Sequence, residues 1–354
     1  MLFVTWNVTS RPLTVISRLL CPTLLSTSPA CDEAVSSTTV PCAMSSQLLP
    51  LRLMKGLMVT LAVAVLQTAI RSSVGANTIP NDYFAVEDFT CADAARLLPP
   101  RGEPPLILQV VNEHYLKMQE NFMLIMRQNS PQRMDSICLI CLDDNSADTM
   151  SALFGIPCVR LDGVTSLRDL WVTRAKILVC LLQEGHDVLL SDNDALWLSD
   201  PIPDLRAIEG DILVQRGIVP AKYRDPVYGS TMCMGFGLFR AGGERMSKFL
   251  QVMADAVNQS GDDQVGLNKA ASLLGLKWDY NTSRSDMRNT ESTRVGLGVL
   301  TDLPGNFIVA LLPHNRYTRN CRVSPVSSET IVAHCFPRHG REQAMKKANL
   351  WLAD

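Results

Sequence analysis

Residues 186–201 read HDVLLSDNDALWLSDP and place two aspartates, Asp192 and Asp194, directly after a short apolar run. The run VLL is typical of a strand that is buried on both faces. In an extended chain, side chains two residues apart point to the same side, so both carboxylates are expected on one face. Carboxylates placed so closely repel each other, and each has a raised pKa unless a cation relieves the repulsion. The stretch therefore predicts a buried strand that ends in a cation site.

The chemistry of the two carboxylates narrows the kind of cation. Carboxylate oxygens are hard ligands that suit Mn²⁺ or Mg²⁺, and these ions usually keep coordination positions free for phosphate oxygens. The sequence thus favours a divalent-metal site that binds a diphosphate. A solvated turn capped by aspartates is the alternative, because isolated D-x-D triplets are common in such turns. Trp197, which follows the pair, is expected in the core.

The bulk composition permits a large core and gives no reason to expect nucleic acid as a partner. The chain has 354 residues, of which 47% are hydrophobic. Lys and Arg number 33 against 35 Asp and Glu, which gives a net charge of -2. This balance, with no basic run along the chain, offers no surface that would follow a phosphate backbone.

The N-terminal third divides into segments of different composition. Residues 1–53 are a low-complexity leader, expected to be disordered, and 54–72 hold an apolar run between basic residues. That run is shorter than the about 20 residues that span a bilayer, so it suits a signal peptide or a short signal-anchor. A buried helix and an organellar transit peptide are the alternatives. Residues 73–105 have stem or linker composition, and 106–354 form the expected globular domain.

This order predicts a protein of the secretory pathway, held in the Golgi membrane in type II orientation with a lumenal domain. Asn258 and Asn281 stand in glycosylation sequons, which is compatible with that location. Cys138 and Cys141, two of the eleven cysteines, form a C-x-x-C inside an apolar run. With no second pair at zinc spacing, we expect inert core thiols there. In an oxidising compartment, Cys233, Cys321 and Cys335 could form disulfides, and the sequence leaves their pairing open.

Strand and helix patterns alternate early in the domain, and strands dominate later. A helical spacing of apolar residues runs over 107–126, and further helices are expected over 143–155, 166–185 and 243–259. Strands are expected at 136–142, 158–163, 187–192, 210–217, 232–242, 294–304, 306–313 and 329–335. The order predicts an α/β fold with a central mixed, mostly parallel sheet flanked by helices. Ligands bind such sheets outside the carboxyl ends of the strands, where the aspartate pair stands.

Four motifs, in order, resemble those of Golgi-type nucleotide-diphospho-sugar transferases, which have the GT-A (Rossmann-like) glycosyltransferase fold. They are LLQEGHDVLLSDNDALWLSDPIPDL (181–205), MGFGLFRAG (234–242), GDDQVGLNKA (261–270) and IVAHCFPRHGREQAMKKANLW (331–351). The similarity covers about 136–352 and is greatest to glycosyltransferase family 77. One departure is Met234, where that family often has Asn.

The resemblance implies roles for five residues around a donor. Asp192 would contact the ribose and the metal, Asp194 would ligate the metal, and His334 would be its third protein ligand. Asp263 and Gln264 would be the catalytic pair, lining the pocket for the sugar and the acceptor. From the residues alone, a satisfied histidine at a strand end is the favoured interpretation of His334, and Asp263 could be an exposed loop carboxylate.

The resemblance also implies four residues that bind the nucleotide diphosphate. Lys346 or Lys347 would pair with the diphosphate, and Asp143 and Lys176 would lie near the nucleotide. Each lysine could instead belong to the solvated face of a helix, and Lys176 has the weakest support because every amphipathic helix has a polar side.

The expected function is metal-dependent transfer, with retention, of a sugar from a UDP-sugar to a hydroxyl of a glycan or glycoprotein. Two alternatives remain. Phosphatases of the haloacid-dehalogenase type also place D-x-D after an apolar strand, but they normally carry Thr or Val where this chain has Leu196. A sugar-nucleotide-binding relative without turnover is the second alternative, and Met234 gives it some support.

Overall fold

Ten strands form one mixed sheet in the computed structural model, which describes residues 83–85, 91, 105–279, 294–319, 326–335 and 340–353. In spatial order they are β1 (Tyr83–Ala85), β4 (Cys158–Asp162), β3 (Ile137–Cys141), β2 (Leu106–Val111), β5 (Val188–Ser191), β8 (Thr231–Phe239), β7 (Ile212–Gly217), β11 (Phe307–Leu311), β10 (Gly296–Leu300) and β9 (Leu276–Trp278). The strands from β1 to β5 are mutually parallel, and β8 runs antiparallel between β5 and β7. Beyond them β7 and β11 are parallel, while β10 and β9 are antiparallel to their neighbours.

A second, three-stranded sheet lies at the end of β5. It consists of β12 (Tyr317–Thr318), β13 (Val332–His334) and β6 (Ala195–Trp197), with β13 parallel to β12 and antiparallel to β6. Because β6 follows β5 after only three residues, the chain passes from the large sheet to the small one at the aspartate pair.

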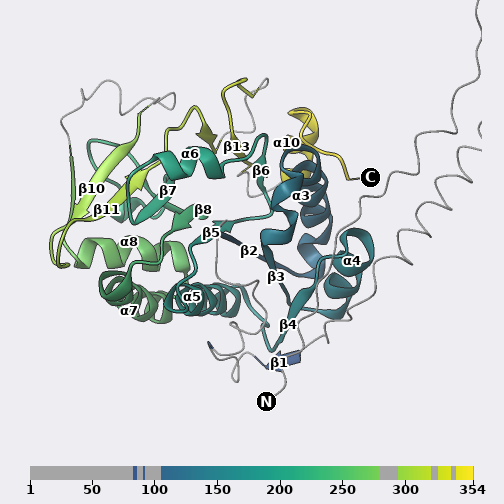
Figure 1. Cartoon of the computed structure of the whole chain (residues 1–354), viewed down its shortest axis with the longest axis horizontal. Coiled ribbons are helices and arrows are strands. Elements are labelled where there is room, and N and C mark those ends of the chain that lie inside the picture. Colours follow the sequence, from purple (N-terminus) through teal and green to yellow (C-terminus); the bar gives the residue numbers. More distant parts are fainter. Residues whose placement is uncertain are drawn as a thin grey trace, which may run out of the picture. The chain divides into compact units, whose positions relative to one another are not determined.

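Helices cover both faces of the large sheet (Figure 1). One layer holds α5 (Leu167–Gln183), α7 (Gly243–Ser260) and α8 (Asp263–Leu273), whose apolar residues share one core cluster. The other layer holds α3 (Leu116–Asn129), α4 (Asp144–Phe154) and α6 (Ile202–Ala207), which share a second cluster. The helix α10 (Arg341–Lys347) lies beside α3, and single 3-10 turns occur at Glu113–Tyr115, Pro131–Ser136 and Ala221–Tyr223. A mixed sheet between helices confirms the predicted fold class.

The alternation of side chains along the central strands explains their unbroken apolar sequence. Leu108 and Leu190 point into the cluster under α5 and α7, whereas Ile107 and Leu189 point into the cluster under α3. Both faces of β2 and β5 are therefore buried, and Gln109 is the one polar residue inside β2.

The expected helix over 107–126 is wrong in its first part, because β2 occupies Leu106–Val111 and α3 begins at Leu116. A short apolar run has no periodicity that separates a buried strand from a buried helix. Asn112 marks the change, since its side chain accepts a hydrogen bond from the backbone N–H of Tyr115. The helix expected over 143–155 is present as α4, and Asp143 is its N-cap.

The cysteines differ from the expectation of inert thiols. Cys141 of β3 forms a disulfide with Cys158 of the neighbouring strand β4, so only Cys138 of the C-x-x-C is a free thiol. The two residues are close enough because β3 and β4 are paired, which spacing along the chain does not reveal. Cys335 is disulfide-bonded, whereas Cys233 is free and buried. Cys321 lies outside the described residues.

The N-terminal predictions are largely untested. The leader 1–53, the apolar segment 54–72 and the sequon at Asn281 lie outside the described residues. In the part of the chain that the structure describes, no helix has both the length and the apolar character needed to cross a membrane. Within the predicted stem, Tyr83–Ala85 pair with β4 and Cys91 forms a disulfide with Cys180 of α5.

Candidate active site

The aspartate pair lies on a tight turn rather than in extended chain. The strand β5 ends at Ser191, and the backbone N–H of Ala195 donates to the carbonyl of Asp192 at 2.9 Å. Asp192 is itself tied to β8, because its N–H donates to the carbonyl of Gly235 at 2.7 Å. The expectation of an extended D-x-D is therefore wrong, since the chain must turn here to enter the second sheet.

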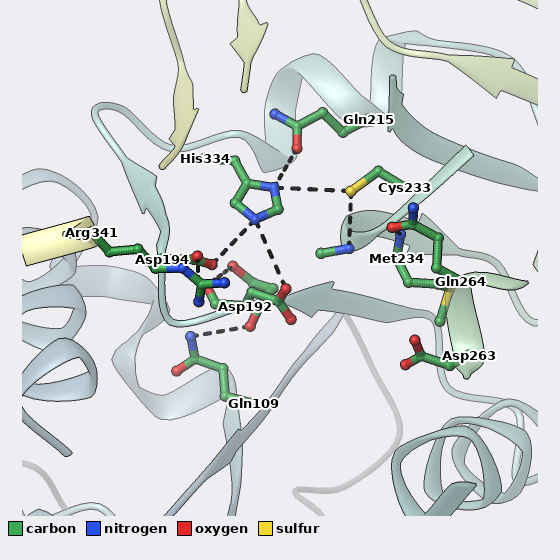
Figure 2. A network of polar contacts seen from close by, with 12 residues as sticks. Gln109, Asp192, Asp194, Gln215, Cys233, Met234, Asp263, Gln264, His334 and Arg341 are labelled. Atoms are coloured by element: carbon green, nitrogen blue, oxygen red, sulfur yellow. Dashed lines mark hydrogen bonds and ion pairs between the residues drawn. The ribbon is translucent and has the colours of Figure 1, made fainter. Parts of the chain in front are cut away.

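Strand pairing in the small sheet brings His334 to this turn. His334 lies opposite Ala195 in the β6–β13 pair, and the N–H of Cys335 donates to the carbonyl of Asp194 at 2.8 Å. The imidazole Nε2 is 3.2 Å from Asp194 Oδ1 and 3.9 Å from Asp192 Oδ2 (Figure 2). One ligand atom from each of the three residues lies within 4.8 Å of the others. Asp194 and His334, 140 positions apart, thus meet in the arrangement that the family resemblance implies for a metal site.

Gln215 of β7 fixes the orientation of the imidazole. Its amide nitrogen donates to the carbonyls of Tyr317 and Thr318, both at 2.9 Å, so its oxygen faces His334 Nδ1 at 2.8 Å. Nδ1 must then carry a proton, which leaves the lone pair of Nε2 directed at the aspartates in the neutral ring. A second hydrogen-bonding residue of this kind is the usual support of a metal-bound histidine.

Gly235 of β8 keeps the space between the ligands open. A Cβ at this position would overlap the imidazole of His334 and lie 2.7 Å from Asp192 Oδ2. Only glycine leaves room there, and the backbone conformation does not otherwise demand it, because its φ is not positive. The volume that the missing side chain frees adjoins the atoms that would hold a cation.

The charged groups of the cluster shift each other's pKa values. Although burial favours its neutral form, the charge of Asp194 raises the pKa of His334, and His334 in turn lowers the pKa of Asp194. Arg341 adds a further contact, with its guanidinium 3.0 Å from the second oxygen of Asp194. Two carboxylates and an imidazole form a donor set suited to Mn²⁺ or Mg²⁺, so the residues present fit a divalent ion.

Asp263 stands on the other side of the turn, held by an arginine. Arg174 of α5 lies between two carboxylates, 2.5 Å from Asp263 Oδ2 and 2.5 Å from Asp192 Oδ1. Asp263 is only 2% exposed, so it is not an exposed loop carboxylate. Burial raises the pKa of Asp263, an effect that Arg174 opposes.

The start of α8 presents Asp263 and Gln264 to the site. Gly261 ends α7 in the left-handed conformation (φ 68°), and Asp262 caps α8 by accepting from the N–H of Val265. The amide oxygen of Gln264 accepts from the N–H of Met234 at 3.3 Å. These contacts join the first turn of α8 to β8 and fix the direction of both side chains.

All five of the residues assigned to metal and catalysis line one cavity of about 570 Å³: Asp192, Asp194, Asp263, Gln264 and His334. An apolar wall with Tyr115 and Trp171 faces them, and Arg319 and Arg341 supply positive charge. A cavity of this size, mostly apolar with a few convergent polar groups, is typical of a small-molecule site.

The four predicted nucleotide-binding residues do not line this cavity. Asp143 caps α4 and also accepts from the N–H of Glu113 at 2.6 Å. Lys176 is exposed on α5, and Lys346 is exposed and pairs with Glu342 on α10. Lys347 is exposed as well. Their contact with a nucleotide stays a prediction, and the basic residues that line the cavity are instead Arg174, Arg319 and Arg341.

Helical spacing could have identified Arg174 in the sequence. Leu167, Leu170, Trp171 and Arg174 all line the cavity, at the i, i+3, i+4 and i+7 positions of one helical face. Lys176 is about 200° round the helix from Arg174 and so faces away from it. Gln215 carries no comparable signal, because strand pairing and a β-bulge next to it bring it to the site. Arg341 comes from the start of α10 and has no apolar spacing that indicates its contact with Asp194.

Residues 163–295 match a known family of enzymes. The family is that of the nucleotide-diphospho-sugar transferases. The matched segment contains Asp192, Asp194, Asp263 and Gln264 but ends before His334. The match confirms the predicted family and the predicted class, glycosyltransferase, but does not single out family 77. No curated protein sequence matches the chain.

Solved structures with a similar arrangement are glycosyltransferases of low sequence identity. The bifunctional glycosyltransferase WbbM is 10% identical with a TM-score of 0.36, over 49% of this chain and 38% of that one. GlyE of Streptococcus pneumoniae is 12% identical with a TM-score of 0.43, over 70% of this chain and 60% of that one. The galactosyltransferase LgtC, solved with donor and acceptor sugar analogues, is 12% identical with a TM-score of 0.35, over 70% of this chain and 96% of that one. The chain thus spans less than two thirds of the first two proteins.

Proposed function

We propose that this glycosyltransferase depends on a divalent metal and moves a sugar from a UDP-sugar to a hydroxyl of a glycan or glycoprotein, with retention of configuration. The observation that carries the proposal is the meeting of Asp192, Asp194 and His334 at the rim of a cavity that also holds Asp263 and Gln264.

The residues of the metal-side half act on the departing diphosphate. Asp194 and His334 would hold Mn²⁺ or Mg²⁺, with Asp192 shared between the ion and the ribose. When bound, such an ion stabilises the negative charge that develops on the leaving phosphate. Arg341 and Arg319, which line the same cavity, add fixed positive charge close by. An arginine guanidinium is well shaped to contact two phosphate oxygens at once.

The residues of the α8 half act on the sugar. The anomeric carbon acquires positive charge as its bond to the diphosphate breaks, as in glycoside hydrolysis. The carboxylate of Asp263 and the amide of Gln264 are the groups of this half that line the cavity, and Arg174 keeps Asp263 in a fixed position. Retention then proceeds through a transient bond to one of these groups or through attack from the face of the leaving group.

The location belongs to the same proposal. The enzyme acts in the lumen of the secretory pathway, in the Golgi, anchored by residues 54–72. The disulfides Cys91–Cys180 and Cys141–Cys158 support an oxidising compartment, because cytosolic proteins rarely keep such bonds. The exposed sequon at Asn258 is accessible to glycosylation there.

Donor turnover tests the function. Purified chain would be treated with EDTA and supplied with a panel of UDP-sugars, with and without Mn²⁺, while UDP release is followed. We expect Mn²⁺-dependent UDP release with at least one donor, and a loss of about 100-fold or more in Asp194→Ala or His334→Ala. Lys248→Ala, on the exposed face of α7, is the control. Turnover that is unaffected by EDTA and by both variants would contradict the proposal.

The same assay separates the alternative functions. A phosphatase would release inorganic phosphate from small esters and leave UDP-sugars intact. A relative without turnover would bind UDP in the presence of Mn²⁺ and release no product from any donor.

A further inference from the structure

A second cavity, of about 500 Å³, lies beside the first and takes no part in the function proposed above. The loop that follows β7 forms one side of it with Lys222, Tyr223 and Arg224, and β9 forms the other with Lys277 and Trp278. None of these residues lines the first cavity.

Three elements line both cavities in turn. Along α8, Gln264 lines the first cavity and Asn268 lines the second, one helical turn or about 6 Å further on. Along β8, Met234 and Met232 divide in the same way, about 7 Å apart. The loop places Pro220 on the first cavity and Lys222 on the second. The second cavity is therefore a continuation of the surface that begins at the proposed sugar pocket.

Asn268 makes the connection between them rigid. Its side chain accepts from the N–H of Met232 at 3.0 Å and donates to the carbonyls of Met232 and Gln264, both at 2.8 Å. The amide of Gln264 in turn donates to the carbonyl of Val219 in the loop at 2.5 Å. The helix, the strand and the loop are thus held together where the two cavities meet.

The lining of the second cavity is positively charged. Lys222, Arg224 and Lys277 are exposed. Of the described residues that line it, Asp225 is the acidic one, and it is buried, accepting from the N–H groups of Val227 and Tyr228. The carboxylate of Asp225 is therefore engaged by the backbone of its own turn. The exposed Lys222, Arg224 and Lys277 remain to attract an anion.

Trp278 adds a fixed flat surface to this positive lining. Its ring packs on Gly298 of β10, where a Cβ would lie 2.6 Å from the indole. The ring of Tyr228 meets it edge-on, with centroids 5.3 Å apart. A partly exposed aromatic ring held in this way offers an apolar face to the C–H groups of a sugar ring, with little entropy to lose.

We infer that the second cavity binds the acceptor as an acidic glycan, with the carboxylates of uronic acid residues at Lys222, Arg224 and Lys277 and a sugar ring on Trp278. The inference rests on the proposed glycosyltransferase function and names its acceptor class. The chain of the glycan would run from the second cavity past Asn268, and its terminal hydroxyl would enter the first cavity near Gln264.

Binding of trigalacturonate to the full chain, measured by calorimetry without donor, tests the inference. The fully methyl-esterified trisaccharide is the matched neutral ligand. We expect the double variant Lys222→Gln/Lys277→Gln to bind trigalacturonate about tenfold more weakly, because each exposed ion pair contributes modestly. The affinity for the neutral trisaccharide should change little in that variant. Trp278→Ala should weaken the binding of both trisaccharides. The control is Lys117→Gln/Lys248→Gln, two exposed lysines that line neither cavity.

The outcomes separate this inference from the function on which it rests. Equal binding of the charged and the esterified trisaccharide, or no effect of Lys222→Gln/Lys277→Gln, would overturn it even if UDP release is observed. Tighter binding of tripolyphosphate than of trigalacturonate would also overturn it, in favour of a general anion site. Lysine-dependent binding of trigalacturonate without any donor turnover would support the site and contradict the proposed function instead.

Discussion

The amide oxygen of Gln215 lies 2.8 Å from Nδ1 of His334, and the amide nitrogen of the same residue is held by two backbone carbonyls. This contact fixes which imidazole nitrogen faces the two aspartates. It makes Gln215 a positioning residue for the candidate metal site, although Gln215 does not line the cavity.

Replacing Gln215 therefore tests the orientation of His334 without touching a ligand. Gln215→Leu removes the acceptor at Nδ1 and should weaken Mn²⁺ binding about 10- to 100-fold, the usual effect of losing a hydrogen bond behind a metal ligand. Mn²⁺ affinity, measured by electron paramagnetic resonance, is the readout. Gln215→Glu keeps an acceptor and should retain most of the affinity. Equal affinities in all three proteins would exclude this role.

Gly235→Ala should close the metal site while leaving the fold in place. The added methyl group would occupy the space between His334 and Asp192, so Mn²⁺ affinity should fall by about tenfold or more. Gly237→Ala is the control, since its Cβ would instead meet Val214 in the core, 2.7 Å away. That variant should lower the melting temperature and leave the Mn²⁺ affinity of the folded protein unchanged. Full affinity in Gly235→Ala would contradict the geometry of the site.

Arg174 is expected to stabilise the fold through Asp263. Arg174→Met leaves a buried carboxylate without its partner and should lower the free energy of unfolding by about 3 kcal/mol or more. Arg174 lowers the pKa of Asp263, so without it that pKa rises further. The unpaired carboxylate costs most where it is charged, so the loss should be greater at pH 8 than at pH 5.

Two further variants isolate the pair in urea unfolding. Adding Asp263→Asn to Arg174→Met should recover part of the loss, because the uncompensated charge is gone. Lys117→Met, which breaks an exposed pair with Glu120, should cost less than about 1 kcal/mol. If Arg174→Met lowers the free energy of unfolding no more than Lys117→Met does, the buried pair does not stabilise the fold.

Cys138 predicts a dependence of stability on alkaline pH. Burial raises the pKa of its thiol from 9.0 to about 12, so the thiol ionises in the unfolded chain before it ionises in the folded one. Its contribution is present below pH 9 and is lost above it, at no more than about 1.4 kcal/mol per pH unit. Cys138→Ala should flatten the fall in unfolding free energy between pH 9 and 10.5. If the unfolding free energies of both proteins fall in parallel with pH, burial does not raise the pKa of the Cys138 thiol.

Several parts of the fold could be predicted from the sequence because local patterns determine them. The helix Leu167–Gln183 begins at a complete capping box of Ser166 and Asp169, and its spacing is unambiguous. The strands β5 and β8 follow from their apolar runs. The strand at Leu106–Val111 could not be separated from the helix after it, because burial on both faces removes the alternation that identifies a strand.

The site could be predicted only as far as its residues lie in recognisable motifs. Asp192, Asp194, Asp263, Gln264 and His334 belong to such motifs, and the structure brings all five to one cavity. Gln215 reaches it through strand pairing, which leaves no trace in local spacing. Arg341 lies inside the fourth motif, but nothing in its local sequence indicates that it contacts Asp194. The spacing of α5 does carry a signal for Arg174, which lies on the face of the helix that lines the cavity, whereas Lys176 faces away from it.

The central claim is that Asp192, Asp194 and His334 together hold a divalent ion beside the donor cavity. Electron paramagnetic resonance of Mn²⁺ titrated into EDTA-treated protein, with and without UDP, tests it most directly. We predict one tightly bound ion per chain whose affinity rises when UDP is added and falls at least tenfold in both Asp194→Asn and His334→Gln. Mn²⁺ that stays free in solution at all concentrations, or binds the two variants as tightly as the original protein, would contradict the claim.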